Sequence, residues 1–485
     1  MRVAVIGAGP AGMTAALQLS RGGADVVVYE ASSRIGGMAG SLDLWGHRVD
    51  FGPHRFFSTD TRVNRLWLDV VGDDYGMVER RTRIYYAGRF FRYPLRPIEA
   101  AWTMGPLRAA QCVASYLWAH RRAGDTASDE ASFETWVVRR FGRRLFEMFF
   151  KSYSEKLWGI PCAELSADFA AQRIKQFSLA GALSAAWSRP HAGRHRTLVD
   201  RFAYPSRGTG AVYERMAELV RAGGGQVHLK SPVRRLTRDG SRISGVELSD
   251  GRCENFDHVI STMPLTLLVR GLEPPADVQA AADALQFRNT VLVYMHVDRD
   301  NLFDDQWLYI HAPELTMGRV TNFRNWLPRS ASTPRTSVLA AEFWCNDGDA
   351  TWTEEDTQLI DRATRELRTA GLLGTARVLA GHVERIPRCY PVYRRGYQQH
   401  VQRLADYLQT FTDLTVIGRY GTFKYNNQDH SILMGLLAAE NLLAHRGHNL
   451  WSINTDYDAY QERSVITERG LLPEPVAAVR EVAVG

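Results

Sequence analysis

Residues 418–435, GRYGTFKYNNQDHSILMG, place a run of hydrogen-bonding side chains directly before an apolar helix that is expected over 432–443. The side chains of 424–431 supply amide, hydroxyl, carboxylate and imidazole groups. Capping a helix uses only one or two such groups, whereas the N–H groups of a helix N-terminus also attract anions. The pattern therefore predicts residues that cap the helix and also line a polar pocket. These residues are Asn427, Gln428, Asp429 and Ser431.

A second chemistry-bearing motif begins the chain. The strand RVAVI leads into Gly7, Gly9 and Gly12, a helix expected over 11–19, and the strand DVVVYE, which ends in Glu30. Glycines let backbone N–H groups approach a pyrophosphate at a helix N-terminus, and the terminal carboxylate can accept hydrogen bonds from ribose hydroxyls. Because strand, turn, helix, strand and carboxylate occur in this order, the motif predicts a dinucleotide-binding unit.

The residues that follow Glu30 indicate which dinucleotide binds. RIGG at 34–37 completes an E-x3-R-x-G-G pattern, which resembles the second fingerprint of FAD enzymes of the glutathione-reductase-2 type. The resemblance implies FAD, and no His or Cys attachment signal is apparent, so we expect non-covalent binding. It also places the polar cluster of 424–431 at the flavin, where a helix N-terminus favours the negative charge of the reduced form. The residues expected along the pyrophosphate are Arg34, Gly36 and Gly37.

Hydrophobic patterns predict an α/β fold of interleaved units. Residues 75–97 alternate like a hairpin that turns at 87–88, whereas 98–200 show helical spacing. Val233 is expected to contact the cofactor, and core strands are expected at 258–264 and 414–421. We predict a Rossmann-like FAD-binding domain (1–74, 201–275 and 410–462), a helical domain (98–200), a mixed or antiparallel β-sheet substrate domain (75–97 and 276–409) and a C-terminal tail (463–485).

Composition narrows the classes of partner. The formal charge is +6, but only five of the 59 basic residues are lysine, and the arginines are scattered rather than grouped into a basic tract. This distribution argues against nucleic acid and suits an anionic small ligand. No apolar run reaches the ~18 residues of a membrane span. The five cysteines lack metal-site spacing, so we expect no metal. No leader precedes the first strand, so we expect a cytoplasmic protein. No pattern indicates an oligomeric state.

Several blocks together carry a family resemblance. The chain resembles the UDP-galactopyranose mutase branch of the flavin amine-oxidase superfamily, particularly its longer eukaryotic type. The blocks run nearly end to end: the fingerprint of 5–37, VDFGPHRFFS (49–58), FFRYPL (90–95), the segment 132–161, FAYPSRGTGAVY (202–213), ISTMP (260–264), MGRVTNFRNW (317–326), CYPVY (389–393) and GRYGTFKYNNQDHS (418–431).

The resemblance implies chemistry without net redox change. The N5 atom of the reduced flavin attacks the anomeric carbon of a nucleoside-diphosphate sugar, and the sugar opens and recloses with the other ring size. A nicotinamide nucleotide is a possible external reductant. Arg173 and Arg319 match the arginines that hold the diphosphate in this family, and two guanidinium forks suit phosphate oxygens.

Further site residues follow from the same resemblance. Tyr390 and Tyr425 match tyrosines near the diphosphate and sugar, and Tyr93 matches one near the nucleotide. His54 lies on a loop that is expected to touch the flavin N5 edge through its backbone, which makes its side chain a poor candidate for a general base. Arg419 and Asn427 are expected beside the flavin or the substrate.

Two other functions stay open. A flavin oxidase or desaturase of the amine-oxidase, protoporphyrinogen-oxidase or carotenoid-desaturase kind could use Tyr390 and Tyr425 as an aromatic cage. The protein could also be a non-catalytic binder of the same fold that lacks flavin. The intact fingerprint argues against this function. The sequence also departs from the family at 93–96, where YPLR replaces the Tyr-Pro-Phe-Gln typical of UDP-sugar enzymes. That departure leaves the nucleotide base open.

Overall fold

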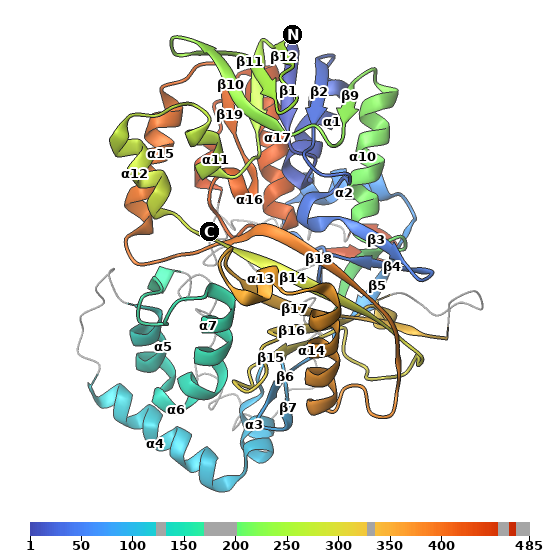
Figure 1. Cartoon of the computed structure of the whole chain (residues 1–485), viewed down its shortest axis with the longest axis vertical. Helices are drawn as coiled ribbons and strands as arrows, with labels where there is room; N and C mark the ends of the chain where they lie inside the picture. The colour runs from blue at the N-terminus through green and yellow to red at the C-terminus, as the bar shows by residue number, and fades with distance from the viewer. Residues whose placement is uncertain (123–131, 169–200, 327–334, 454–464, 472–485) are drawn as a thin grey trace, which may run out of the picture.

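A computed structural model of the chain describes residues 1–122, 132–168, 201–326, 335–453 and 465–471. Its first layer, at the top of Figure 1, is a five-stranded parallel sheet in the order β19-β13-β1-β2-β9. Three of its strands have mostly buried apolar side chains, as expected for a parallel sheet covered on both faces. The strands are β1 (Arg2–Ile6), β2 (Asp25–Tyr29), β9 (Gln226–His228), β13 (His258–Ser261) and β19 (Leu414–Val416).

Two helices of this layer pack unusually closely. These are α1 (Pro10–Arg21) and α17 (Gln428–Ala444). A Cβ atom on Gly435 of α17 would lie 2.5 Å from the carbonyl oxygen of Ala11 and 2.7 Å from the Cβ atom of Thr14. Only glycine permits this approach, which aligns the two helices over the sheet. Helices α2 (Thr61–Val71) and α10 (Gly210–Ala222) complete the same apolar core.

Smaller antiparallel elements surround this layer. The first is a three-stranded sheet of β10 (Val233–Asp239), β11 (Arg242–Leu248) and β12 (Cys253–Asn255). The others are the pairs β3 (Ser41–Leu44) with β4 (His47–Asp50), β5 (Tyr75–Glu79) with β8 (Arg201–Pro205), and β20 (Ile466–Thr467) with β21 (Gly470–Leu471).

The second layer is a seven-stranded mixed sheet in the order β18-β14-β17-β16-β15-β6-β7. Its pairs are antiparallel except for β15 with β6. Helix α14 (Asp356–Thr369) covers it with Leu359, Ala363 and Leu367, which are spaced four residues apart and fully buried. The strands are β6 (Thr82–Tyr86), β7 (Arg89–Arg92), β14 (Phe287–Val297), β15 (Trp307–Ile310), β16 (Arg319–Asn322), β17 (Ser337–Cys345) and β18 (Val378–Pro391).

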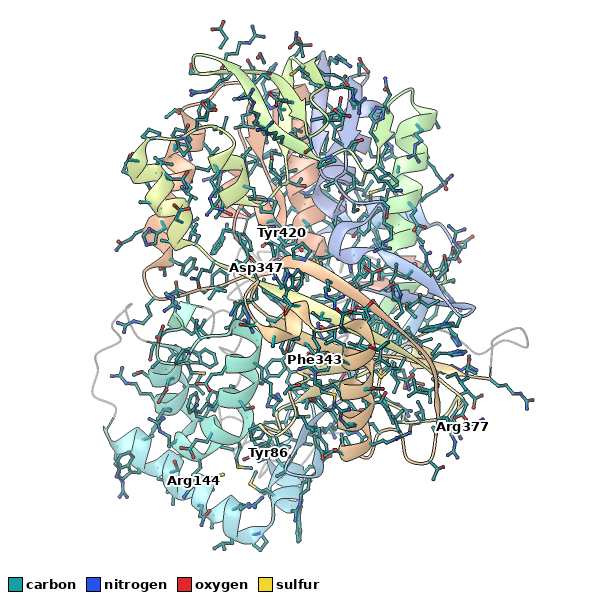
Figure 2. The ribbon with its side chains drawn as sticks, in the orientation of Figure 1. Tyr86, Arg144, Phe343, Asp347, Arg377 and Tyr420 are labelled. Atoms are coloured by element: carbon teal, nitrogen blue, oxygen red, sulfur yellow. The ribbon has the colours of Figure 1, made fainter. Side chains whose placement is uncertain are left out.

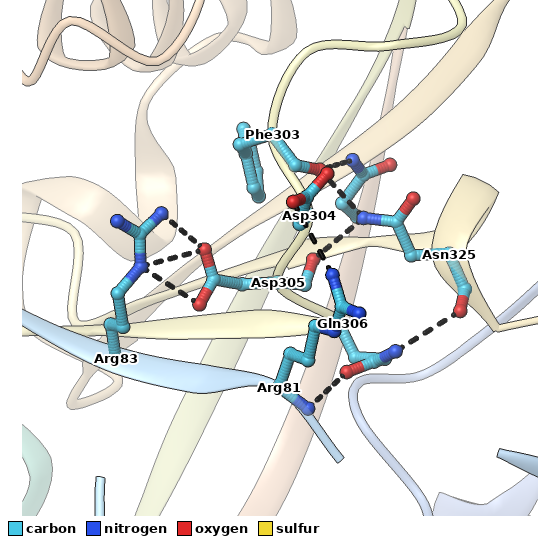
Figure 3. Close-up of polar contacts among 8 residues, drawn as sticks. Arg81, Arg83, Phe303, Asp304, Asp305, Gln306 and Asn325 are labelled. Carbon is cyan, nitrogen blue, oxygen red and sulfur yellow. Dashed lines mark hydrogen bonds and ion pairs between the residues drawn. The ribbon is translucent and has the colours of Figure 1, made fainter. Parts of the chain in front are cut away.

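A polar network fixes the only parallel pair among the described strands of this sheet. Arg83 of β6 forms a bidentate ion pair with Asp305, whose exposed side-chain fraction is only 4%. The Gln306 side chain accepts a hydrogen bond from the Arg81 N–H (2.6 Å) and donates one to the carbonyl oxygen of Asn325 (3.3 Å), as Figure 3 shows. These bonds hold the segment that leads into β15 and therefore its side chains.

A helical unit lies beside the second sheet, in cyan and teal in Figure 1. It contains α3 (Pro97–Met104), α4 (Pro106–Arg122), α5 (Phe133–Phe141), α6 (Arg143–Phe146), a π-helical turn (Glu147–Lys151) and α7 (Ser152–Trp158). Lys156 of α7 joins it to the sheet, because its Nζ donates to the carbonyl oxygens of Ile310 (3.1 Å) and Ala312 (2.7 Å). Further helices are α11 (Leu265–Arg270), α12 (Ala276–Ala284), α13 (Ala350–Thr353), α15 (Tyr397–Gln409) and α16 (Gly418–Gly421).

The predicted fold class is confirmed, and several element boundaries need correction. The hairpin that turns at 87–88 joins β6 to β7, but β5 pairs with β8 instead of belonging to that hairpin. The last core strand ends at Val416, and Gly418–Gly421 forms α16 rather than strand. Helix α17 begins at Gln428, not at 432, so the polar residues form its first turn. Within the predicted tail, Ile466 is buried.

Asp50 is a buried carboxylate that holds the loop after β4. It accepts hydrogen bonds from the Ser41 hydroxyl (2.5 Å), the Tyr204 hydroxyl (2.8 Å) and the Thr209 N–H (3.1 Å). The Thr209 hydroxyl in turn donates to the carbonyl oxygen of His54 (3.0 Å). Burial among neutral groups disfavours the charged form and raises the pKa of Asp50 to about 6, although the three hydrogen bonds oppose the shift.

We predict that Asp50 makes the fold less stable as the pH rises from about 4 to 6. The folded state retains a proton on Asp50 that the unfolded chain loses in this range, so the favourable contribution is complete below pH ~4 and is lost towards pH ~6. The size is on the order of 2–3 kcal/mol. Urea unfolding at several pH values should show a flatter profile for Asp50→Asn. Asp43→Asn, an exposed change in the adjoining β-hairpin, is the control; parallel profiles for Asp50→Asn and the parent would contradict the assignment.

Candidate active site

A cavity of about 670 Å³ lies between the parallel sheet and the seven-stranded sheet. This size is ordinary for a site that binds a small molecule or cofactor. Tyr420, one of its lining residues, is at the junction of the two layers in Figure 2. Most of the predicted site residues in the described part of the chain meet here. Those that line the cavity are Gly7, Gly9, Glu30, Gly37, His54, Tyr93, Val233, Arg319, Tyr390, Arg419, Tyr425, Asn427, Gln428 and Ser431.

One end of the cavity is the glycine-rich turn between β1 and α1. Gly7 has a φ of +100°, and a Cβ atom there would lie 2.1 Å from the Thr262 hydroxyl oxygen. Gly9 is the N-cap residue of α1 and has no side chain to cover the N–H groups of the first turn. Gly37 approaches from the other side, since its Cβ atom would be 3.2 Å from the Cα atom of Gly9. These backbone groups form a narrow cradle for an anion. Gly12 lies outside the lining and instead packs α1 against the turn, because a Cβ atom there would lie only 2.0 Å from the Gly7 carbonyl oxygen.

The Glu30 carboxylate is held in place by main-chain donors. Its two oxygens accept hydrogen bonds from the N–H groups of Ala8 (2.7 Å) and Ser32 (2.8 Å). A carboxylate oxygen has two acceptor directions, so each can still accept a ribose hydroxyl. Val233 at the start of β10 lines the cavity near this carboxylate, because Ser231 donates its N–H to the Glu30 carbonyl oxygen.

The structure does not bring Arg34 to the cavity. Its guanidinium forms an ion pair with Glu384 of β18 (2.8 Å) and lies over the ring of Phe51. The pair connects the fingerprint loop to the seven-stranded sheet. Gly36 has a φ of +103° and donates its N–H to the Ala8 carbonyl oxygen, so it shapes the turn rather than lining the cavity.

The N-terminus of α17 forms a second anion-attracting edge of the same cavity. Asn427 is its N-cap residue but does not cap the helix with its side chain. Gln428 accepts a hydrogen bond from the Tyr213 hydroxyl (2.7 Å), and Ser431 donates to the Asn427 carbonyl oxygen (3.2 Å). Asp429 is buried against His430 (3.0 Å) and does not line the cavity. Capping therefore accounts for little of this polar cluster.

Arg319 is anchored before any ligand arrives. Its Nε and Nη2 atoms each donate to one oxygen of Glu342 at 2.6 Å, and Nη2 also lies 3.4 Å from the Tyr390 hydroxyl. Glu342 is 1% exposed, in the otherwise apolar strand β17. Strong pairing outweighs desolvation and keeps the pKa of Arg319 well above its ordinary value. The sequence contained a signal for this pair, because a lone Glu in SVLAAEFWC needs a buried partner.

Arg419 lies over two stacked tyrosines. The rings of Tyr390 and Tyr425 are 5.5 Å apart with an interplanar angle of 19°. The Arg419 guanidinium lies 4.2 Å from the Tyr425 centroid and 5.0 Å from that of Tyr390, within cation–π distance. Its hydrogen bonds go to the carbonyl oxygens of Cys389 and Asn426. Since these acceptors are neutral, Arg419 contributes positive charge to the cavity.

His54 is neutral in this environment. Burial and the nearby positive charges of Arg319 and Arg419 lower the pKa of its imidazole to about 3. Its Nδ1 atom is buried and finds no hydrogen-bond partner within the described structure. The same is true of the Oδ1 atom of Asn426, a cavity-lining residue that the sequence-based site prediction omitted. Both atoms are closed off from solvent, so they are buried polar atoms whose hydrogen-bonding capacity the described structure leaves unused.

The far end of the cavity is aromatic. Tyr93, whose exposed fraction is 41%, packs edge-on against Tyr309 at 5.2 Å. Trp307 and Tyr309 of β15 and Arg55 also line this end and were not predicted. The alternation of WLYI, which puts two aromatics on one face of a strand, was the available signal. Arg173 lies outside the described residues.

The residues present fit a flavin dinucleotide. A glycine-rich turn with the shape to hold a pyrophosphate, a carboxylate that can accept ribose hydroxyls and a second helix N-terminus line one continuous cavity. In the part of the chain that the structure describes, no group of three or more His, Cys, Asp or Glu side chains could hold a metal ion. Among the same residues, no helix is long and apolar enough to cross a membrane. Fold and cavity are thus those expected of a flavoprotein, with the seven-stranded sheet across the cavity from the glycine-rich turn.

Comparison with known proteins identifies the family. The model of the flavin containing amine oxidoreductase family matches residues 10–415, and the chain belongs to this family. It is therefore a flavin-dependent enzyme of the amine oxidase superfamily, and the predictions of the superfamily and of a flavin cofactor are confirmed.

Individual relatives point to different reactions. Coproporphyrinogen III oxidase of Staphylococcus aureus is 23% identical over 475 residues, which cover 91% of this chain and 99% of that protein. A probable UDP-galactopyranose mutase of Klebsiella pneumoniae is 27% identical over 172 residues, which cover 34% and 43%. A crystal structure of reduced UDP-galactopyranose mutase superposes with a TM-score of 0.80 at 21% identity and covers 92% of this chain and 96% of that one. At this identity, the last similarity concerns the fold.

We predict that Gly9→Val prevents flavin binding without unfolding the protein. Gly9 has an ordinary negative φ, so a side chain is tolerated locally but projects into the cradle beside Gly37. Absorbance of the purified protein should show at least tenfold less bound flavin, with an unchanged circular dichroism spectrum. The control is Gly76→Val, at a strand glycine whose Cβ atom would meet nothing within 4 Å. Full flavin content in Gly9→Val would contradict this prediction.

We also expect the flavin to be bound non-covalently, so acid should release it from the parent protein into the supernatant. Colour that stays with the precipitate would contradict that expectation.

Proposed function

We propose that the protein is an FAD-dependent mutase that interconverts the pyranose and furanose forms of a nucleoside-diphosphate sugar. The observation that carries the proposal is the Arg419 guanidinium, stacked on Tyr390 and Tyr425 beside Arg319. FAD would lie along the glycine cradle and the α17 N-terminus, and in its reduced form it would supply the nucleophile. The diphosphate would lie where the arginines converge.

The tyrosine pair argues against an amine substrate. An aromatic cage needs two rings far enough apart to admit a cation between them, whereas these rings stack on each other at 5.5 Å. Arg419 already occupies the cationic position over both rings. A second cation would be repelled, while an anion is attracted. The pocket therefore favours a negatively charged substrate.

Arg319 would orient the diphosphate rather than supply most of the net charge. Glu342 neutralises it and fixes the plane of its guanidinium through two parallel hydrogen bonds. Its Nη1 atom has no hydrogen-bond acceptor among the described residues and belongs to a side chain that lines the cavity. Pre-orientation of this kind lowers the entropy cost of binding. Arg419 would supply the net attraction.

His54 would not act as an acid or base near neutral pH, because its pKa is about 3. Its loop is held from behind by Thr209, so its backbone can keep a fixed position next to the ligand. Tyr93 would contact the nucleotide at the aromatic end, where Tyr309 supports its ring. No paired carboxylates are needed for this chemistry.

The alternative function is a flavin oxidase or desaturase. Its support is the Staphylococcus aureus coproporphyrinogen III oxidase, whose similarity covers 91% of this chain, compared with 34% for the Klebsiella pneumoniae mutase. The two functions differ in the oxidation state that they require, and this difference separates them experimentally.

We predict that activity requires reduced flavin. Protein reduced with dithionite or a nicotinamide nucleotide should convert members of a panel of sugar nucleotides into isomers that chromatography resolves, with no net consumption of reductant. Oxidised protein should be nearly inert, because only reduced flavin is nucleophilic enough. Turnover by oxidised protein with equimolar hydrogen peroxide would instead establish the oxidase.

We also predict that Arg419→Met weakens nucleoside-diphosphate binding about 10- to 100-fold, the loss expected for a charge-assisted hydrogen bond. Arg419→Lys should recover part of it, because an ammonium restores charge but not the planar fork. Calorimetry of the flavin-loaded variants measures both. Arg234→Ala, at an arginine that is 71% exposed, is the control and should bind like the parent.

Arg319 needs a different substitution. Arg319→Ala would leave Glu342 buried without its partner, which commonly costs about 3–5 kcal/mol of stability. Arg319→Lys keeps the charge pair but loses the fork, so we expect weaker diphosphate binding with near-normal stability. Arg173→Ala tests the second arginine that the sequence resemblance assigns to the diphosphate. Unchanged nucleoside-diphosphate affinity in the variants of all three arginines would disprove the diphosphate site.

A further inference from the structure

Exposed apolar side chains gather on helices α3 and α4. Among the described residues, ten large hydrophobic side chains are exposed, and six of them lie in these two helices. The most exposed is Trp102, at 83%. A soluble surface normally scatters such residues singly, so this concentration indicates a binding surface. We call it the α3–α4 face; its apolar members are Ile98, Trp102, Leu107, Val113, Leu117 and Trp118.

The orientation of α4 is opposite to that of an ordinary surface helix. Its only two buried side chains among 106–121 are Cys112 and Ala119. The exposed residues Leu107, Ala110, Ala114, Leu117 and Trp118 recur at spacings of three and four and therefore form one stripe. An apolar stripe usually faces the core, but this one faces outward. In Figure 1, α4 lies at the end of the molecule remote from β1.

The charge around this stripe is strongly positive. Residues 89–122 contain six arginines and one acidic residue, Glu99. Arg92, Arg96, Arg108 and Arg121 are exposed, and none of the ion pairs within the described structure involves them. Their charges are therefore available to an anionic partner.

We propose that the α3–α4 face docks on the surface of a bilayer that contains anionic lipids. Outward Trp, Leu and Ile with flanking arginines are the composition of helices that lie in the membrane interface. Tryptophan favours the head-group level, and each arginine gains from the negative surface potential. A second copy of the chain fits less well, because a two-fold contact through this face would bring like charges together.

Docking on this face would also orient the cavity. Tyr93 lines the cavity, is 41% exposed and is separated from the start of α3 by only three residues. One end of the cavity would thus open beside the lipid head groups. The docking proposal does not depend on which flavin reaction the protein catalyses.

Co-sedimentation of the flavin-loaded protein with vesicles tests the proposal. Vesicles of phosphatidylcholine with about 30% phosphatidylglycerol should bind the protein, phosphatidylcholine alone should bind it at least tenfold less, and high salt should weaken binding. The double variant Trp102→Ser/Trp118→Ser should lose about tenfold in partition, as should Arg108→Glu/Arg121→Glu. Flavin absorbance and thermal stability should stay unchanged in both.

Matched controls separate this face from general surface effects. Leu379→Ser removes an apolar side chain that is 49% exposed in β18, and Arg365→Glu/Arg368→Glu reverses two exposed arginines of α14. Both controls should bind vesicles like the parent. Absence of binding to anionic vesicles, or equal binding by all variants, would overturn the proposal. A dimer in sedimentation velocity that Trp102→Ser/Trp118→Ser abolishes would overturn it too and assign the face to a second copy.

Discussion

The close contact between α1 and α17 is the constraint on which the site depends. Gly435 lets the two helices approach until only a hydrogen atom fits between the Cα atom of one and the backbone of the other. Their N-termini, at Gly9 and Asn427, therefore open into one cavity. A larger residue at 435 would separate the helices, and the cofactor would lose one of its two anion-attracting edges.

The electrostatics of the cavity divide the work between two arginines. Arg319 is paired with Glu342 and contributes geometry, whereas Arg419 is bound to neutral carbonyl groups and contributes charge. Burial and the charges of these two arginines lower the pKa of His54 to about 3. The site therefore has positive charge without an ionised histidine. This combination supports the proposal of an anionic substrate.

The two sheets contribute different parts of the cavity. The parallel sheet carries the glycine-rich turn, the seven-stranded sheet carries Arg319 and Tyr390, and Lys156 and the Arg83–Asp305 pair hold β15 against the helical unit and β6. The proposed docking face belongs to the helical unit, at the end of the molecule remote from β1.

The sequence by itself determined the cofactor class, the α/β fold and most of the residues that meet in the cavity, because glycine turns, a terminal carboxylate and local periodicity act over short stretches of chain. Only the tertiary structure decided the partners of the arginines. Arg34 and Glu384 are 350 residues apart, and no local pattern relates them. Likewise, α17 begins at Gln428, whose side chain accepts a hydrogen bond from Tyr213, a contact across 215 residues that no local pattern predicts. The sequence pattern of α4 predicts a helix. Which face of that helix is exposed depends on how the rest of the chain packs against it.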